Sequence, residues 1–151
     1  MAARQIQIVK GTLSQAAANS TEYITIPVVT RGERALQVYG VEFSMNGAFI
    51  EAQGSHASFM ANLKAVSKSG AKVMPLHRWC KVLFLIGGGG GVGAWDLTDT
   101  WVAPPSLVVG LDHLIVELTS TNLDSATAID YQVFYKPVGI SDIQALQFQT
   151  E

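Results

Sequence analysis

The chain has 151 residues, of which 48% are hydrophobic and 15% are charged, and its formal net charge is −2. A domain of about 150 residues buries roughly 68–70% of the surface of its unfolded chain. This length therefore suits one domain, residues 1–151, whereas each of two domains would be too small to form a sufficient hydrophobic core. The charged fraction is well below the usual ~25%. Uncharged polar residues or neighbouring subunits must therefore cover the surface, and we favour neighbouring subunits.

Composition also limits the compartment. The single cysteine, Cys80, excludes an internal disulfide, and its place in an apolar run predicts a small buried side chain. The first residues lack the apolar segment of a signal peptide. The longest uncharged apolar run, residues 82–95, has fourteen residues, short of the ~20 that span a membrane. We therefore expect no membrane span and no dependence on an oxidising compartment.

The charges are divided between the two parts of the chain. Residues 1–95 hold nine basic and four acidic residues, a net +5, whereas residues 96–151 hold one basic and eight acidic residues, a net −7. Such asymmetry suits head-to-tail contact between copies or a face for nucleic acid. The alternative is a set of scattered, solvated charges that average out once the chain is folded.

Short alternating segments, separated by turn residues, fill most of the chain. In chain order, strands are expected at residues 5–9, 22–30, 35–45, 57–67, 76–86, 96–102, 106–110, 114–119 and 127–136. A helix is the alternative for residues 57–66, because Ala, Met and Leu favour it. Residues 1–21 then form a short N-terminal strand and a mobile connection, and residues 138–151 form a C-terminal tail. This spacing predicts an all-β sandwich or barrel.

Two of these strands carry specific expectations. Within residues 35–45, strict alternation places Tyr39, Val41 and Phe43 on one face and Leu36 and Val38 on the other. Within residues 76–86, the apolar residues stop alternating. This predicts an inner strand with both faces buried, one in the sandwich and one under a neighbouring element or subunit.

Six glycines follow this strand within residues 87–93 and contain the spacing G-x-G-x-x-G by accident. In dinucleotide-binding proteins that motif opens a helix, whereas residues 97–105 are β-branched, aromatic and then broken by two prolines. We therefore expect an exposed tip held by neighbouring copies rather than a phosphate loop. The residues expected at this subunit interface are Gly88, Gly89, Gly90, Gly91, Val92, Trp95 and Trp101.

Catalytic and metal-binding patterns are missing from the sequence. His56, His77 and His113 are twenty or more residues apart without a metal-ligand spacing, and we expect them in turns or at strand ends in water. No serine lies in a nucleophile elbow. We therefore expect no enzyme activity, no catalytic residues, no metal and no cofactor.

Two further groups of side chains suggest binding. A weak contact with nucleic acid or another acidic partner would use Lys64, Lys68, Lys72 and Arg78. A platform for stacking on sugars would use the aromatic residues Trp79, Trp95, Trp101, Tyr39, Tyr131 and Tyr135. Their positions within strands favour a place in the core or in a subunit contact over a sugar platform.

The strand Asp130-Tyr131-Gln132-Val133-Phe134-Tyr135-Lys136 and its short tail end a unit of ~150 residues with uncharged connections and strands that are apolar on both faces. Residues 22–137 thereby resemble the single jelly-roll capsid proteins of small icosahedral viruses. The resemblance implies a jelly-roll β-sandwich of about eight antiparallel strands, in two sheets ordered BIDG and CHEF. Many such proteins carry a basic N-terminal arm for the genome, whereas residues 1–9 hold only Arg4. The implied partners are therefore other copies and other capsid proteins, with nucleic acid as a weak candidate.

Together these features lead us to expect a structural protein that assembles with copies of itself into a closed virus shell and is located in the virion. Contacts between the positive first part and the acidic last part of neighbouring copies would assist assembly. The alternative is a lectin-like β-sandwich that binds a carbohydrate or another ligand, in the cytoplasm or outside the cell.

The glycine-rich tip yields a first prediction. Replacing Gly89 to Gly91 with bulky residues should impair assembly more than folding, because these residues are expected to contact other copies rather than their own core. Size-exclusion chromatography measures the assembly and thermal unfolding measures the fold. Normal assembly of the variant would mean that the tip is only a spacer.

Overall fold

A computed structural model describes residues 6–26, 35–46, 56–66, 73–84, 98–104, 108–110, 113–123 and 126–138. These residues form nine strands and no helix. The strands are β1 (Gln7–Ser14), β2 (Thr21–Ile26), β3 (Ala35–Asn46), β4 (His56–Val66), β5 (Val73–Phe84), β6 (Thr98–Val102), β7 (Val108–Gly110), β8 (His113–Thr121) and β9 (Ala128–Val138).

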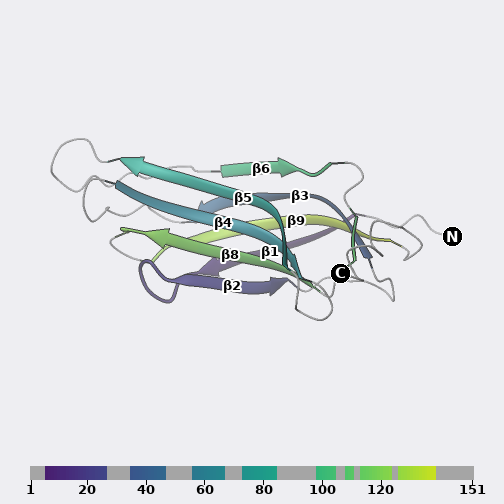
Figure 1. Cartoon of the computed structure of the whole chain (residues 1–151), viewed down its shortest axis with the longest axis horizontal. Helices are drawn as coiled ribbons and strands as arrows, with labels where there is room; N and C mark the ends of the chain where they lie inside the picture. Colours follow the sequence, from purple (N-terminus) through teal and green to yellow (C-terminus); the bar gives the residue numbers. More distant parts are fainter. Residues whose placement is uncertain are drawn as a thin grey trace.

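The strands form two antiparallel sheets that lie one behind the other (Figure 1). One sheet has the order β1-β9-β3-β6, with β7 also paired to β3, and the other has the order β2-β8-β4-β5. Lettering the strands B to I along the chain, with the three-residue β7 left out, turns these orders into BIDG and CHEF. The expected jelly-roll β-sandwich is therefore confirmed.

The core lies between the two sheets and follows the alternation of the sequence. In β8, every second residue from Leu114 to Ser120 is buried, and in β9 every second residue from Ile129 to Pro137. Residues 56–66 form a strand and not the alternative helix, because Phe59, with the alternate residues after it, joins the core that faces the other sheet. Each large apolar side chain that is fully buried stabilises the fold by about 1.5–3 kcal/mol, and the sum of these contributions holds the two sheets together.

Strand β3 departs from the expected alternation through a β-bulge. The register with β9 shifts between Val38 and Gly40, so Tyr39 is an extra residue in β3. Even-numbered residues of β3 point into the core before the bulge, and odd-numbered residues do so after it. Leu36 and Val38 before it and Val41 after it are all buried, while Tyr39 points outward. The expectation that Tyr39 shares a face with Val41 was therefore wrong, because alternation continues only where no residue is inserted.

The bulge also divides the edge next to β3. Strand β7 pairs with residues 35–37 and β6 pairs with residues 40–44, and between them the Ala103 amide donates a hydrogen bond of 2.8 Å to the Tyr39 carbonyl oxygen. A Cβ atom at Gly40 would overlap the backbone carbonyl oxygen of Trp101. Glycine is therefore required where β6 joins the bulge.

The first strand is longer than expected and ends in a connection that is hydrogen-bonded to the rest of the fold. Strand β1 continues through Gly11 to Ser14, and at Gly11 a Cβ atom would overlap the phenol of Tyr131. Burial raises the pKa of the Tyr131 hydroxyl above its ordinary value. The segment that was expected to be a mobile connection therefore includes half of a strand.

Two amide side chains anchor the connection between β1 and β2 to the one between β8 and β9. The buried Gln15 accepts a hydrogen bond of 3.0 Å from the Thr127 amide and donates one of 2.8 Å to Ser120 Oγ. Asn19, in the left-handed region at φ 63°, accepts a bond of 2.8 Å from the Leu123 amide and donates one of 3.0 Å back to the Leu123 carbonyl oxygen.

Strand β5 is an edge strand rather than the expected inner strand. It pairs with β4, and no other described strand pairs with it. Trp79 faces the core, whereas the adjacent Cys80 lies on the outer face and is exposed. The expectation of a buried Cys80 was wrong because the outer face of an edge strand is open to solvent within one chain. Cover by a second subunit remains a prediction.

The close approach at Gly40 gives a second prediction. Gly40→Val should lower the free energy of unfolding by about 1–3 kcal/mol, because the new side chain meets a backbone carbonyl group that cannot move without breaking the β3–β6 pairing. Urea unfolding measures the change. The matched control is Ser44→Val on the same strand, where the change should stay within about 0.5 kcal/mol. Equal effects would contradict the assigned steric role.

Candidate functional site

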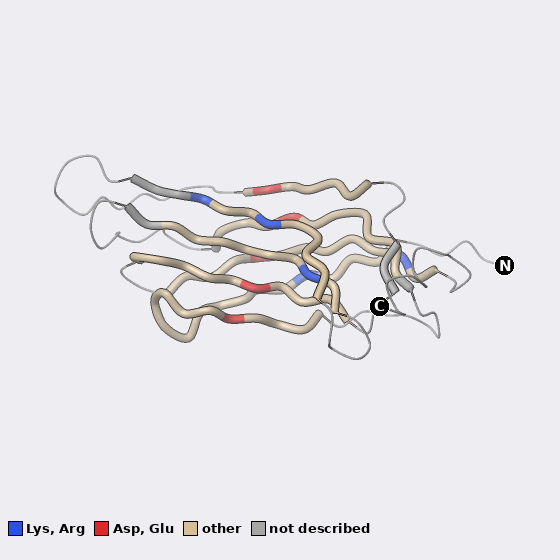
Figure 2. The backbone as a smooth tube through the Cα atoms, in the orientation of Figure 1, with Lys and Arg blue, Asp and Glu red and all other residues tan. Residues whose placement is uncertain are grey.

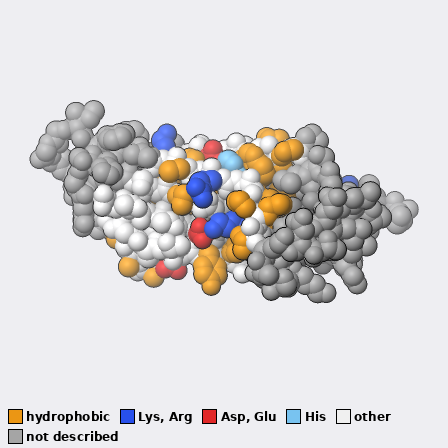
Figure 3. All heavy atoms as spheres, in the orientation of Figure 1, with side chains coloured by type: hydrophobic (Ala, Val, Ile, Leu, Met, Phe, Trp, Pro, Cys, Tyr) orange, Lys and Arg blue, Asp and Glu red, His pale blue; other side chains and the backbone are white. Residues whose placement is uncertain are grey.

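The outer face of the β2-β8-β4-β5 sheet combines a small charged network with exposed apolar side chains (Figure 3). Charged positions are sparse along the described strands, as Figure 2 shows. Across the middle of this face, strand register places Tyr23, Glu117, Asn62 and Arg78 in one row, with one residue from each strand. This row is the most polar part of the face and is the candidate site.

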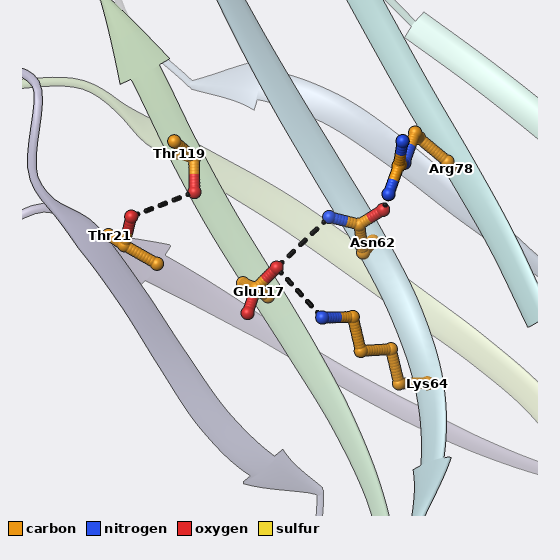
Figure 4. Close-up of polar contacts among 6 residues, drawn as sticks. All are labelled: Thr21, Asn62, Lys64, Arg78, Glu117 and Thr119. Carbon is orange, nitrogen blue, oxygen red and sulfur yellow. Dashed lines mark hydrogen bonds and ion pairs between the residues drawn. The ribbon is translucent and has the colours of Figure 1, made fainter. Parts of the chain in front are cut away.

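The network is centred on Asn62 and Glu117 (Figure 4). The Asn62 amide donates a hydrogen bond of 3.1 Å to Glu117 Oε1, and Lys64 Nζ lies 3.0 Å from the same oxygen. Arg78 Nε donates a bond of 3.0 Å to Asn62 Oδ1. Beside this group, the Thr21 and Thr119 hydroxyl oxygens are 3.0 Å apart. Asn62 therefore connects an anion on one neighbouring strand with a cation on the other.

Burial makes Asn62 the structural centre of this network. It is only 1% exposed, although it lies on the outer face of the sheet. A buried amide must have hydrogen-bond partners, and Glu117 and Arg78 supply them. No buried side-chain nitrogen or oxygen in the described part of the chain lacks a partner. The network thus fixes the positions of its charged members.

The predicted basic contact is only partly described. The structure brings Lys64 and Arg78 together through Asn62, whereas Lys68 and Lys72 lie outside the described residues. Glu117 compensates the charge of Lys64, and this reduces what Lys64 could contribute to binding a phosphate. Arg78 is exposed and remains the stronger candidate for an acidic partner.

Apolar side chains are exposed beside the charged network. Tyr23, at the end of the row, is 70% exposed, and Val73, near the other end of the sheet, is 50% exposed. Cys80 also faces solvent on this side. The outer face is therefore neither a uniformly solvated surface nor a basic groove, because exposed apolar side chains lie beside the charged network.

A second group of polar and aromatic residues closes the edge of the sandwich where β5 faces β6 (Figure 1). His77 Nε2 lies 2.6 Å from Asp99 Oδ2, which links one sheet to the other. The imidazole also stacks on Trp101 at a centroid distance of 5.1 Å and on Phe43 at 6.3 Å. His77 is half-buried in mid-strand, so the expectation of a turn or strand-end histidine was wrong.

Sequence reasoning missed the His77–Asp99 pair for a physical reason. The two residues are 22 positions apart and lie on edge strands of different sheets. Their contact depends on which edges face each other, and hydrophobic alternation along a strand does not specify this. The sequence held one weak signal of this pair. His77 is a polar residue two positions before Trp79, on the face of β5 that points toward the core, where a polar side chain needs a partner.

The predicted subunit-interface residues lie mostly outside the described residues. This applies to Gly88 through Gly91, Val92 and Trp95. Trp101 is described, half-buried and stacked on His77, and its part in a subunit contact remains a prediction.

Half of the residues of the proposed sugar platform lie in the core. Trp79, Tyr131 and Tyr135 are buried between the sheets, where they cannot stack on a ligand, and Trp95 lies outside the described residues. The preference for a core position is confirmed for these three. Among the described residues, no group of three or more His, Cys, Asp or Glu side chains is placed to hold a metal ion. No described helix is long and apolar enough to cross a membrane.

Comparisons with known proteins find only distant structural likenesses. No family model and no curated protein matches the sequence. The chain is similar to one in a structure of infectious bursal disease virus, Gx strain, with a TM-score of 0.45 and 9% identity over 93% of this chain and 34% of that chain. A mutant VP2 protein of that virus, in derived T=1 particles, gives 0.44 and 10% over 87% of this chain and 31% of that chain.

A third similar structure is that of Desmodium yellow mottle tymovirus, with a TM-score of 0.34 and 8% identity over 93% of both chains. The present chain spans about a third of the length of the infectious bursal disease virus chains. At these values the resemblance to virus capsid proteins is one of architecture alone.

The network at Asn62 gives a third prediction. Asn62→Ala should lower the free energy of unfolding by about 1–2 kcal/mol, because it removes the buried amide that joins Glu117 to Arg78. Lys64→Met is the control, since it keeps an unbranched side chain and removes one ion pair whose side chains are 24% and 25% exposed. Its cost should stay below about 1 kcal/mol. Urea unfolding of both variants tests the ranking, and a larger loss in Lys64→Met would contradict it.

Proposed function

We propose that the chain is a non-enzymatic structural protein that assembles with copies of itself into a closed shell, as the coat of a virion. The observation that carries the proposal is the strand order β1-β9-β3-β6 facing β2-β8-β4-β5, which is the jelly roll of viral capsid domains. The same architecture also serves lectin domains and cupins, and a fold by itself does not assign a function. The surface of the sandwich must therefore decide between them.

Exposed apolar residues favour assembly. A subunit of a closed shell has to contact neighbours on several sides at once. Within the described ranges, the large hydrophobic side chains that are at least half exposed lie near or on strands of both sheets. They are Ile6, Ile8, Tyr23, Val73 and Val102. Charged residues, which oppose close contact between copies, make up only 15% of the sequence. A contact of about 1,600 Å² in total would suffice for one stable interface, and symmetry would repeat it.

A carbohydrate-binding module is the second candidate. Tyr23 is exposed in register with Glu117, whose carboxylate is fixed by Asn62, and an aromatic ring beside fixed polar groups suits a sugar. Against this candidate, Tyr23 was not part of the sugar platform expected from the sequence, and none of the described residues of that platform joins it on this face. Assembly remains the function that more of the surface supports.

The fourth prediction tests assembly directly. Purified chain should form large, uniform particles in size-exclusion chromatography and negative-stain electron microscopy, because burial of the exposed apolar groups favours association. A chain that stays monomeric or dimeric across a wide range of salt and pH would overturn the proposal. Binding to a glycan array that is lost in Tyr23→Ala would instead support the carbohydrate-binding module.

A further inference from the structure

The outer face of the β1-β9-β3-β6 sheet has two adjacent rows of residues with different chemistry. Strand register aligns Ile8, Phe134, Gly40 and Val102 across the sheet in one row. Ile8 is 50% exposed and Val102 is 78% exposed, and Ile6, just before β1, is 52% exposed. Among the residues that the structure describes, three of the five exposed large hydrophobic residues therefore lie on or beside this face.

Tyr39 extends the apolar row. The bulge turns its side chain outward, where its hydroxyl lies 3.3 Å from Gln37 Oε1 and acts as the donor. Phe134 lies in the middle of the row and is half-buried. We name Ile8, Phe134, Tyr39 and Val102 the apolar row. Water on such a surface is released when another apolar surface covers it, which favours association.

The second row carries opposite charges on either side of its middle. Register aligns Lys10 on β1, Gln132 on β9, Glu42 on β3 and Thr100 on β6. Lys10 and Glu42 are thus two strands apart, about 10 Å, and neither forms an ion pair with another described residue. The row presents a cation and an anion at equal distances from β9.

We propose that this face binds the same face of a second copy, around a two-fold axis that runs along β9. Rotation about that axis places the β1 side of one copy over the β3 side of the other. Each Lys10 then meets the Glu42 of the other copy, so one symmetric contact contains two ion pairs. In the neighbouring row, the two Phe134 side chains meet on the axis, and each Ile8 covers the Tyr39 of the other copy.

The size of the face suits a contact within a larger assembly. The axis along β9 brings three strands of each copy, β1, β9 and β3, against the other copy. Three strands about 4.8 Å apart and about eight residues long, at about 3.3 Å per residue, cover about 380 Å² on each copy. The total of about 760 Å² is below the roughly 1,000 Å² of a specific interface that is stable by itself. Such a contact is weak in an isolated pair and becomes stable when a closed assembly repeats it. The inference therefore rests on the proposed function for its partner.

The charged residues near the two ends of β9 limit how far the contact extends, because each would face the same charge of the other copy. Asp130 and Lys136 both lie on the outer face of β9, and each would approach its own symmetry mate. Packed sheets cross at about 30°, which separates residues that are far from the centre of the contact. Asp130 also accepts a hydrogen bond of 2.5 Å from the Thr12 hydroxyl. The centre of the contact is therefore at Gln132 and Phe134.

The fifth prediction is a charge reversal across this contact. Lys10→Glu and Glu42→Lys should each weaken the dimer by roughly tenfold or more, because each places like charges together twice per contact. The double variant should restore binding, since the ion pairs return with their signs exchanged. Sedimentation velocity at low salt measures the dissociation constant, and thermal unfolding checks that each variant is folded.

Lys136→Glu is the matched control, because it reverses a charge on the same face without touching the Lys10–Glu42 pairing. It should leave the dimer about as strong as the original, since it exchanges one pair of like charges at this end of β9 for another pair at the same position. The proposal would be overturned if the single charge reversals at residues 10 and 42 left the dissociation constant of the dimer unchanged. Weakening in Lys136→Glu that Asp130→Lys rescues would also overturn it, because that result places the axis across the strands.

The two proposals can fail independently. Large particles that form equally well in the original chain and in both single variants would support the shell function and exclude this contact. Dimers that the single reversals disrupt, without any larger particle in the original chain, would support the contact and exclude the shell. Electron microscopy of the same samples reads both outcomes.

Discussion

The extra residue at Tyr39 is the constraint on which the arrangement of the sheets depends. If β3 passed Tyr39 in regular strand geometry instead of in a bulge, its two halves would present opposite faces to the core, and either Leu36 and Val38 or the buried residues after Tyr39 would face solvent. The insertion also interrupts the free side of β3, so that β6 and β7 pair with separate parts of it. Gly40 completes this junction because its position leaves no room for a Cβ atom.

The two open sides of the sandwich are closed by different chemistry. On the side of β1 and β2, Gln15 and Asn19 replace missing strand pairing with amide hydrogen bonds to the segment that joins β8 to β9. On the opposite side, between β5 and β6, His77 and Asp99 connect the sheets amid stacked aromatic rings. Both devices fill edges that apolar packing alone would leave accessible to water, and they leave the outer faces free for other contacts.

The outer faces differ in a way that bears on function. One has its charges bound within a single chain, where Asn62, Glu117 and Lys64 satisfy each other. The other carries Lys10 and Glu42 without an ion-pair partner among the described residues. Charges that are already paired give little to a new contact, whereas separated opposite charges can pair across a symmetry axis. Each outer face therefore suits a different kind of neighbour.

The sequence by itself determined the β class, nearly all the strands and the inward residues of β4, β8 and β9, because alternation between two faces is a local property of a strand. It did not determine the bulge at Tyr39, the edge position of β5 with its exposed Cys80, or the pairing of His77 with Asp99. Each of these depends on which strands become neighbours and which edges face each other. Only the tertiary structure decides that, because partners distant in sequence leave no periodic pattern along the chain.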